Sequence, residues 1–186
     1  GSYSMDPSVF KDDDGSYYMY FGGIWGGQLQ QWESGEFDPK GSLTDLGVAN
    51  NPAIMPRMAK LKNNMLEFDE EVKQIQILNK SGEPILTKEL EIRFFEAPWI
   101  HKIKDVYYLS YSTGDTHNLA YATGDNPYGP FTYQGILGEP VQGWTNHHST
   151  IKINDQWYLF YHDTEISGKT HLRNVKFTRF KHNDDG

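Results

Sequence analysis

The stretch Glu96–Gly114, EAPWIHKIKDVYYLSYSTG, decides the fold of this chain. It contains a Pro-marked strand, a tight turn at Lys104-Asp105 and then an aromatic strand. The same plan occurs twice more, in Asp6–Gly23 (DPSVFKDDDGSYYMYFGG) and in His148–Asp163 (HSTIKINDQWYLFYHD). Because helical periodicity is almost absent elsewhere, these repeated hairpins predict an all-β protein built from antiparallel strands.

The spacing of the repeats favours one β architecture. They begin at residues 6, 96 and 148, so the gaps are 96 − 6 = 90 and 148 − 96 = 52 residues. The second gap is near the roughly 40–50 residues of a four-stranded propeller blade. We therefore predict a β-propeller, in which residues 32–91 form a blade with inserted loops and weak strands at Ala53–Ala59 and Val72–Leu78.

The remaining strands are predicted from short aromatic and β-branched runs between turn residues. Tyr17-Tyr18 and Tyr107-Tyr108 are predicted to alternate between core and surface along their strands. The runs are Ser16–Gly22, Asp105–Ser112, Leu119–Thr123, Phe131–Ile136, Ser149–Ile153, Gln156–His162 and Leu172–Phe180.

Composition narrows the function. The 186 residues hold 25 acidic and 17 basic side chains, a net charge of −8, which argues against nucleic-acid binding. There is no apolar run long enough to cross a membrane and no signal-peptide pattern, so we expect a soluble domain and leave its compartment open. The absence of cysteine excludes disulfides, thiolate nucleophiles and Cys-ligated metals within this sequence.

A polar residue opens each repeat, where the innermost strand of a propeller faces the axis. Asp6, Glu96 and the His147-His148 pair are therefore expected to meet in one central funnel. Apolar residues flank both carboxyl groups, and burial among such residues raises a carboxyl pKa. A carboxyl group that keeps its proton near neutral pH can donate it to a leaving oxygen.

Simpler roles stay open for the same residues. Asp6 precedes Pro7 and is equally typical of a turn, Glu96 could lie in solvent at a strand edge, and the histidines could be hydrogen-bonded core or loop residues. Trp25 and Trp144, each in a glycine-containing loop, are candidate platforms for a sugar ring.

The sequence resembles glycoside hydrolase family 43, the five-bladed propeller enzymes that include β-xylosidases and α-L-arabinofuranosidases. The resemblance extends over nearly the whole chain. It rests, in the family's order, on MDPSVFKDDDGSYYMYFGG, FFEAPWIHK, YYLSYSTG, YATGDNPYGPF, GWTNHHS, QWYLFYHD and HLRNVKFT. It implies hydrolysis of terminal pentose glycosides with inversion, first as a β-xylosidase and next as an α-L-arabinofuranosidase, acting on xylo- or arabino-oligosaccharides.

The resemblance also implies roles for individual residues. Glu96 matches the general acid, and Asp6 matches the carboxylate that tunes the acid, with assignment of Asp6 to the base as the alternative. His147, with His148 as the fallback, matches the histidine that reaches a calcium or other divalent ion in the central channel. Three further matches concern the sugar pocket: Arg173 as a contact, and Trp25 and Phe95 as its walls.

The resemblance also predicts that part of the propeller lies outside these residues. We expect residues 1–186 to be a partial propeller domain of about three blades plus partial strands, in which the first blade, the closing strands and the catalytic base are missing. No organic cofactor is expected, and a homo-oligomer is left as an option. A non-catalytic carbohydrate-binding propeller fragment remains the alternative function.

Overall fold

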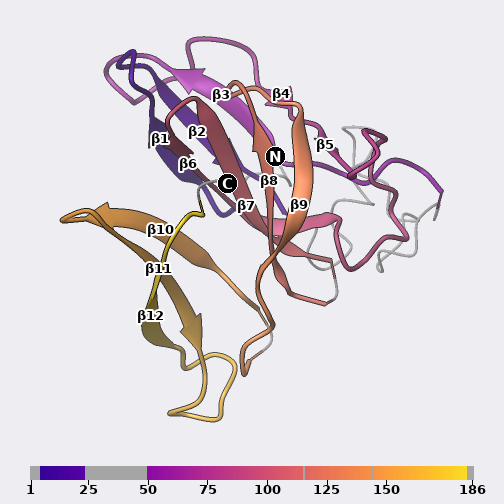
Figure 1. Cartoon of the computed structure of the whole chain (residues 1–186), viewed down its shortest axis with the longest axis vertical. Helices are drawn as coiled ribbons and strands as arrows, with labels where there is room; N and C mark the ends of the chain where they lie inside the picture. Colours follow the sequence, from indigo (N-terminus) through magenta and orange to yellow (C-terminus); the bar gives the residue numbers. More distant parts are fainter. Residues whose placement is uncertain (1–4, 24–49, 115, 144, 184–186) are drawn as a thin grey trace.

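The computed structural model describes residues 5–23, 50–114, 116–143 and 145–183, and in these ranges it is all-β (Figure 1). The described residues contain no helix, and hence none that could cross a membrane. The strands are β1 (Ser8–Lys11), β2 (Tyr17–Phe21), β3 (Arg57–Leu61), β4 (Lys73–Gln74), β5 (Ile77–Leu78), β6 (Phe94–Ile103), β7 (Val106–Thr113), β8 (Leu119–Gly124), β9 (Phe131–Gly138), β10 (His148–Ile153), β11 (Gln156–Asp163) and β12 (Asn174–Phe180).

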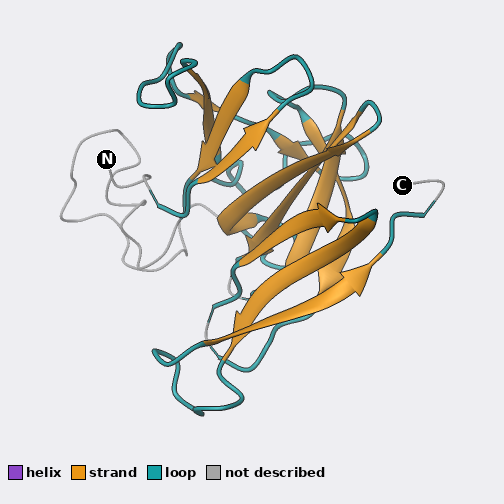
Figure 2. Ribbon diagram, turned by 90° about the vertical axis from the view of Figure 1, so that its left-hand side faces the viewer, coloured by secondary structure: helices purple, strands orange, loops and turns teal. Residues whose placement is uncertain are grey.

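The strands form three sheets, one for each sequence repeat. Their strand orders are β1-β2-β3-β4, β5-β9-β8-β7-β6 and β10-β11-β12. Each repeat forms the hairpin that the sequence predicts, as shown by the pairs Phe10↔Tyr18, His101↔Tyr108 and Thr150↔Leu159. The all-β prediction is therefore confirmed. Figure 2 shows the third sheet beside the other two, with its long strands crossing in front of them.

Two of the weak strands differ from the prediction. The run Val72–Leu78 does not form one strand, because β4 pairs with β3 in the first sheet whereas β5 pairs in parallel with β9 in the second. The segment therefore bridges two sheets. The other weak strand lies later than Ala53–Ala59, at Arg57–Leu61, where it pairs with β2. Only the position of the partner strands decides these details.

Strand β6 lies at the centre of the molecule and touches β1, β2 and β10. On one side, Tyr107 donates a hydrogen bond of 2.5 Å to the buried carboxylate of Asp12, which also pairs with Lys102 at 2.9 Å. On the other side, the indole of Trp99 donates to the hydroxyl of Thr150 at 3.0 Å. These contacts join the three sheets around β6.

The packing of the second sheet explains why one of the two tyrosine pairs, Tyr107-Tyr108, departs from simple alternation. Tyr107 and Tyr108 are both buried, although neighbouring strand residues face opposite sides. The second sheet is covered on both faces. On one face, Tyr107 contacts Phe10 of the first sheet. On the other face, Tyr108 stacks on the ring of His101, which in turn contacts Trp157 and His182. For this pair the predicted exposed position was wrong, whereas Tyr17-Tyr18 alternates as expected.

Candidate active site

Three of the predicted site residues occupy equivalent places in the three sheets. Asp6 lies just before β1, Glu96 is the third residue of β6, and His147 lies just before β10. The imidazole Nδ1 of His147 is 3.7 Å from Oδ1 of Asp6, although 141 positions separate the two residues (147 − 6 = 141). The structure therefore brings the beginnings of the first and third repeats together.

The backbone around both carboxyl groups is irregular. Asp6 and Ala97, the residue after Glu96, have positive φ angles of 51° and 59°. The pairing of β6 with β7 shifts register on both sides of Glu96, as in a β-bulge. Bulges redirect a side chain out of the regular strand pattern and occur often beside active sites. The hydroxyl of Ser8 donates a buried hydrogen bond of 2.7 Å to the carbonyl of Pro98, which ties the two irregular segments together.

Glu96 has the electrostatic environment of a proton donor. Glu96 is only 5% exposed, and its surroundings together raise its pKa from the usual 4.5 to about 7, with burial as the largest cause. The negative charge of Asp6 contributes to this rise, and the positive charge of Arg173 opposes it. A large fraction of Glu96 therefore keeps its proton at neutral pH and can donate it.

Arg173 reaches the same site from the loop before β12. It is exposed, and its Nε donates to the carbonyl of Thr170 at 3.3 Å. Its charge lowers the pKa of Glu96 and also that of His162 at the end of β11. The guanidinium thus lies close enough to both groups to bias their protonation.

Two polar residues near the site were missed from the sequence. His162 accepts or donates a hydrogen bond of 3.2 Å with the hydroxyl of Thr145, and burial together with the charges of Arg173 and His147 lowers its pKa. Asn146 is buried, and its Oδ1 has no hydrogen-bond partner among the described residues. The only sequence signal for them was position: Asn146 precedes the His pair, and His162 ends the third repeat.

The two adjacent histidines have different surroundings. His147 is exposed beside Asp6, whereas His148 is buried and its Nε2 lies 2.6 Å from the hydroxyl of Ser110 on β7. Burial lowers the pKa of His148 to about 3, with smaller contributions from His147 and His101. His148 is therefore a neutral group that packs against the second sheet.

The predicted aromatic walls are placed only in part. Phe95 is 5% exposed and makes an edge-on contact with His117, with ring centroids 5.2 Å apart, so it offers little open surface to a sugar. Trp25 and Trp144 lie outside the described residues.

Near His147, the described residues fit only a loosely held cation. They contain no group of three or more His, Cys, Asp or Glu side chains that could hold a metal ion. Calcium takes six to eight oxygen ligands, and beside His147 the described residues place one carboxylate, that of Asp6, at 3.7 Å. Such a site suits an ion that keeps most of its water ligands and is contacted by protein atoms on one side only.

Comparisons with known proteins agree with this fold. The family model for glycosyl hydrolases family 43 matches residues 1–186. A xylosidase/arabinosidase of Bacteroides ovatus is 50% identical over all of this chain, and xylosidase/arabinosidase 43A of Humicola insolens is 53% identical. The chain spans 57% and 58% of the lengths of these two relatives.

A solved structure gives the same result. The crystal structure of CoXyl43, a GH43 beta-xylosidase/alpha-arabinofuranosidase from a compost microbial metagenome, in its calcium-free complex with xylotriose, matches with a TM-score of 0.93 and 60% sequence identity. The match covers 99% of this chain and 56% of that one. The three sheets are thus part of a five-bladed β-propeller, and the chain belongs to glycoside hydrolase family 43.

Proposed function

We propose that the protein containing this chain hydrolyses terminal pentose residues of plant cell-wall oligosaccharides with inversion, most directly as a β-xylosidase and next as an α-L-arabinofuranosidase. One observation carries the proposal: a buried carboxyl group, Glu96, with a pKa of about 7, lies in the field of a second carboxylate and an arginine. The names of the relatives support the choice of pentose, because they join xylosidase and arabinosidase activities.

In this proposal, Glu96 is the general acid. It gives its proton to the glycosidic oxygen while the bond from that oxygen to C1 of the sugar breaks. Water forms the new bond to C1 from the opposite face and loses its proton to a carboxylate base. We assign that base to the part of the relatives' length that this chain does not span, since Asp6 is assigned to tuning the acid.

The other site residues act through Glu96 or through the substrate. The negative charge of Asp6 favours the protonated form of Glu96, and Arg173 limits this effect while it offers donors to sugar hydroxyls. Trp25 and Trp144 remain proposed contacts of the terminal sugar, and Phe95, which is 5% exposed, is proposed to meet the sugar only through its small exposed edge. A divalent cation in the channel, reached by His147, would add positive charge beside Asp6.

A substrate test checks this function. A protein of the relatives' full length that contains this chain should release nitrophenol from nitrophenyl β-D-xyloside, and more slowly from nitrophenyl α-L-arabinofuranoside. The first product should be the α-anomer of xylose, because inversion places the new hydroxyl on the opposite face. Proton NMR of the fresh product reads the anomer directly. Binding of xylotriose without release of any sugar would show a carbohydrate-binding protein instead and would refute the proposed activity.

The charges around Glu96 give a second test with two opposite outcomes. Asp6→Asn should lower the pKa of Glu96, and Arg173→Gln should raise it, because the negative charge of Asp6 and the positive charge of Arg173 act on it in opposite directions. The alkaline limb of the pH–rate profile, where the acid loses its proton, should move to lower pH in the first variant and to higher pH in the second.

The same shifts should appear without catalysis. Carboxyl NMR titration of the 186-residue chain follows Glu96 directly, with His147 titrated in parallel because it faces Asp6. Lys169→Gln, in the same loop as Arg173 and exposed, is the control for a general change in surface charge. If both site variants moved the limb in the same direction, the assigned roles of Asp6 and Arg173 would be wrong.

A further inference from the structure

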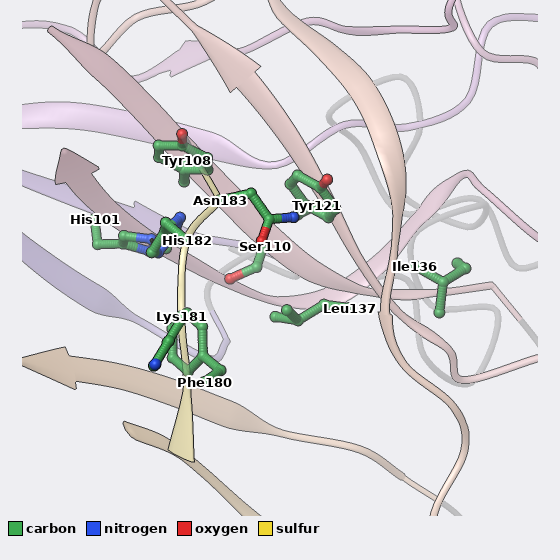
Figure 3. Close-up of a pocket in the computed structure, with 10 residues that line it drawn as sticks. All are labelled: His101, Tyr108, Ser110, Tyr121, Ile136, Leu137, Phe180, Lys181, His182 and Asn183. Carbon is green, nitrogen blue, oxygen red and sulfur yellow. Dashed lines mark hydrogen bonds between the residues drawn. The ribbon is translucent and has the colours of Figure 1, made fainter. Parts of the chain in front are cut away.

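A second cluster of imidazoles lies away from Glu96, where the segment after β12 meets the second sheet. The Nε2 atoms of His101 on β6 and His182 are 3.2 Å apart. Figure 3 shows the two rings next to each other at the edge of a cavity of about 210 Å³. Its lining also includes Tyr108, Ser110, Tyr121 and Asn183.

The ring of His101 is held firmly in place. It stacks on Tyr108 with an interplanar angle of 9°, and its Nδ1 is 3.1 Å from the hydroxyl of Thr150. That hydroxyl also accepts a hydrogen bond from the indole of Trp99. A partner on one imidazole nitrogen fixes the orientation of the ring and directs the lone pair of the other nitrogen, as it does for metal-ligating histidines.

The distance between the two Nε2 atoms suits a shared metal ion. Tetrahedral zinc holds imidazole nitrogens at about 2.0–2.1 Å, so two such ligands lie about 3.3 Å apart. The separation in the structure is 3.2 Å, so the two nitrogens already have the spacing that a shared ion needs, and binding requires the ion to replace the proton between them. Burial lowers the pKa of each histidine, which favours the neutral imidazole, the form that binds metals.

The surroundings leave room for the rest of a coordination shell. The adjacent cavity can hold water ligands, and the side chain of Asn183 lies at its edge. The ammonium group of Lys181, the nearby positive charge, points away from the two imidazoles in Figure 3. Imidazole ligands select zinc, copper or nickel over calcium and magnesium, which prefer oxygen.

We propose that His101 and His182 form a two-histidine site for a borderline transition-metal cation such as Zn²⁺, which fastens the segment after β12 to β6. This site is separate from the cation expected near His147 and differs from it in metal preference. It does not depend on the proposed glycosidase activity. Water completes the coordination, so the affinity should be moderate.

Thermal unfolding of the 186-residue chain tests the site. At a free Zn²⁺ concentration about ten times its Kd, the melting temperature should rise by about 3 °C, because the ion binds only the folded chain. Calcium and magnesium at the same concentration should give no rise through this site. Isothermal titration calorimetry should show one zinc ion bound per chain at the site.

Variants identify the ligands. His182→Asn removes one ligand from a partly exposed position and should abolish the zinc effect without unfolding the chain, and His101→Asn should do the same. His171→Ala is the matched control, since His171 is exposed in the loop before β12 and should leave the effect unchanged. The proposal would be overturned if the zinc effect persisted in His182→Asn, if it disappeared in His147→Ala instead, or if the unaltered chain showed none. The contact between His101 and His182 would then be a simple hydrogen bond.

Discussion

Glu96→Gln, made in a protein of the relatives' full length, is expected to lower kcat/KM for xylobiose by about 10³-fold, within the range that general acid catalysis contributes. Gln has nearly the same shape but cannot donate a proton to the leaving oxygen. The sugar leaving group of xylobiose is a poor one and depends on that proton. The measurement is the initial rate of xylose release.

A second substrate makes this test specific for the acid. Nitrophenolate leaves without protonation, so the rate on nitrophenyl β-D-xyloside should fall far less, by about tenfold. Glu83→Gln is the control, because Glu83 is exposed in the turn between β5 and the next segment. Equal losses on the two substrates would show that Glu96 binds or positions the sugar and is not the proton donor.

The same substitution is expected to stabilise the 186-residue chain above pH 7. The pKa of Glu96 is about 7 when folded and 4.5 when exposed, so the folded chain binds the proton more tightly. Between these values the folded state holds more protons than the unfolded state, and stability therefore falls as pH rises. The full loss is about 3 kcal/mol above pH 7, and it is absent below pH 4.5.

Gln at position 96 is neutral at every pH and avoids this loss. The melting temperature of Glu96→Gln should exceed that of the unaltered chain by about 6–10 °C at pH 8 and should match it at pH 4. Unfolding curves at both pH values provide the measurement, and Glu83→Gln should show no such pH-dependent difference. The contrary result is a difference in melting temperature between Glu96→Gln and the unaltered chain that is the same at pH 8 and at pH 4. It would mean that the ionised form of Glu96 does not destabilise the folded chain.

Much of the fold could be predicted because its signals are local. The hairpins of the three repeats follow from turn residues and aromatic runs that lie within a few positions of each other, as in Asn154-Asp155, where both φ angles are positive in the structure. The pairing of the last residues of Val72–Leu78 with the second sheet could not be predicted, since it depends on β9, more than fifty residues later in the sequence.

The candidate site, like the fold, could be predicted only in part. Repeat position indicated Asp6, Glu96 and the His147-His148 pair, because residues that open equivalent blades are expected to face the same axis, and the family resemblance favoured His147 within the pair. The missed residue His162 lies inside the aromatic run QWYLFYHD, and only folding brings it within reach of the charges of Arg173 and His147. His101 and His182 likewise have no sequence signal, since their Nε2 atoms meet across 81 positions.

The sequence by itself determined the all-β architecture, the repeat and the identity of the polar residues that open each repeat, because these depend on local backbone preferences and on periodicity. Only the tertiary structure decided how those residues behave. The pKa of Glu96 depends on burial by β6 and its neighbours and on charges contributed from the first and third sheets. Desolvation and Coulomb interactions act through space, so they appear only once distant segments are packed together.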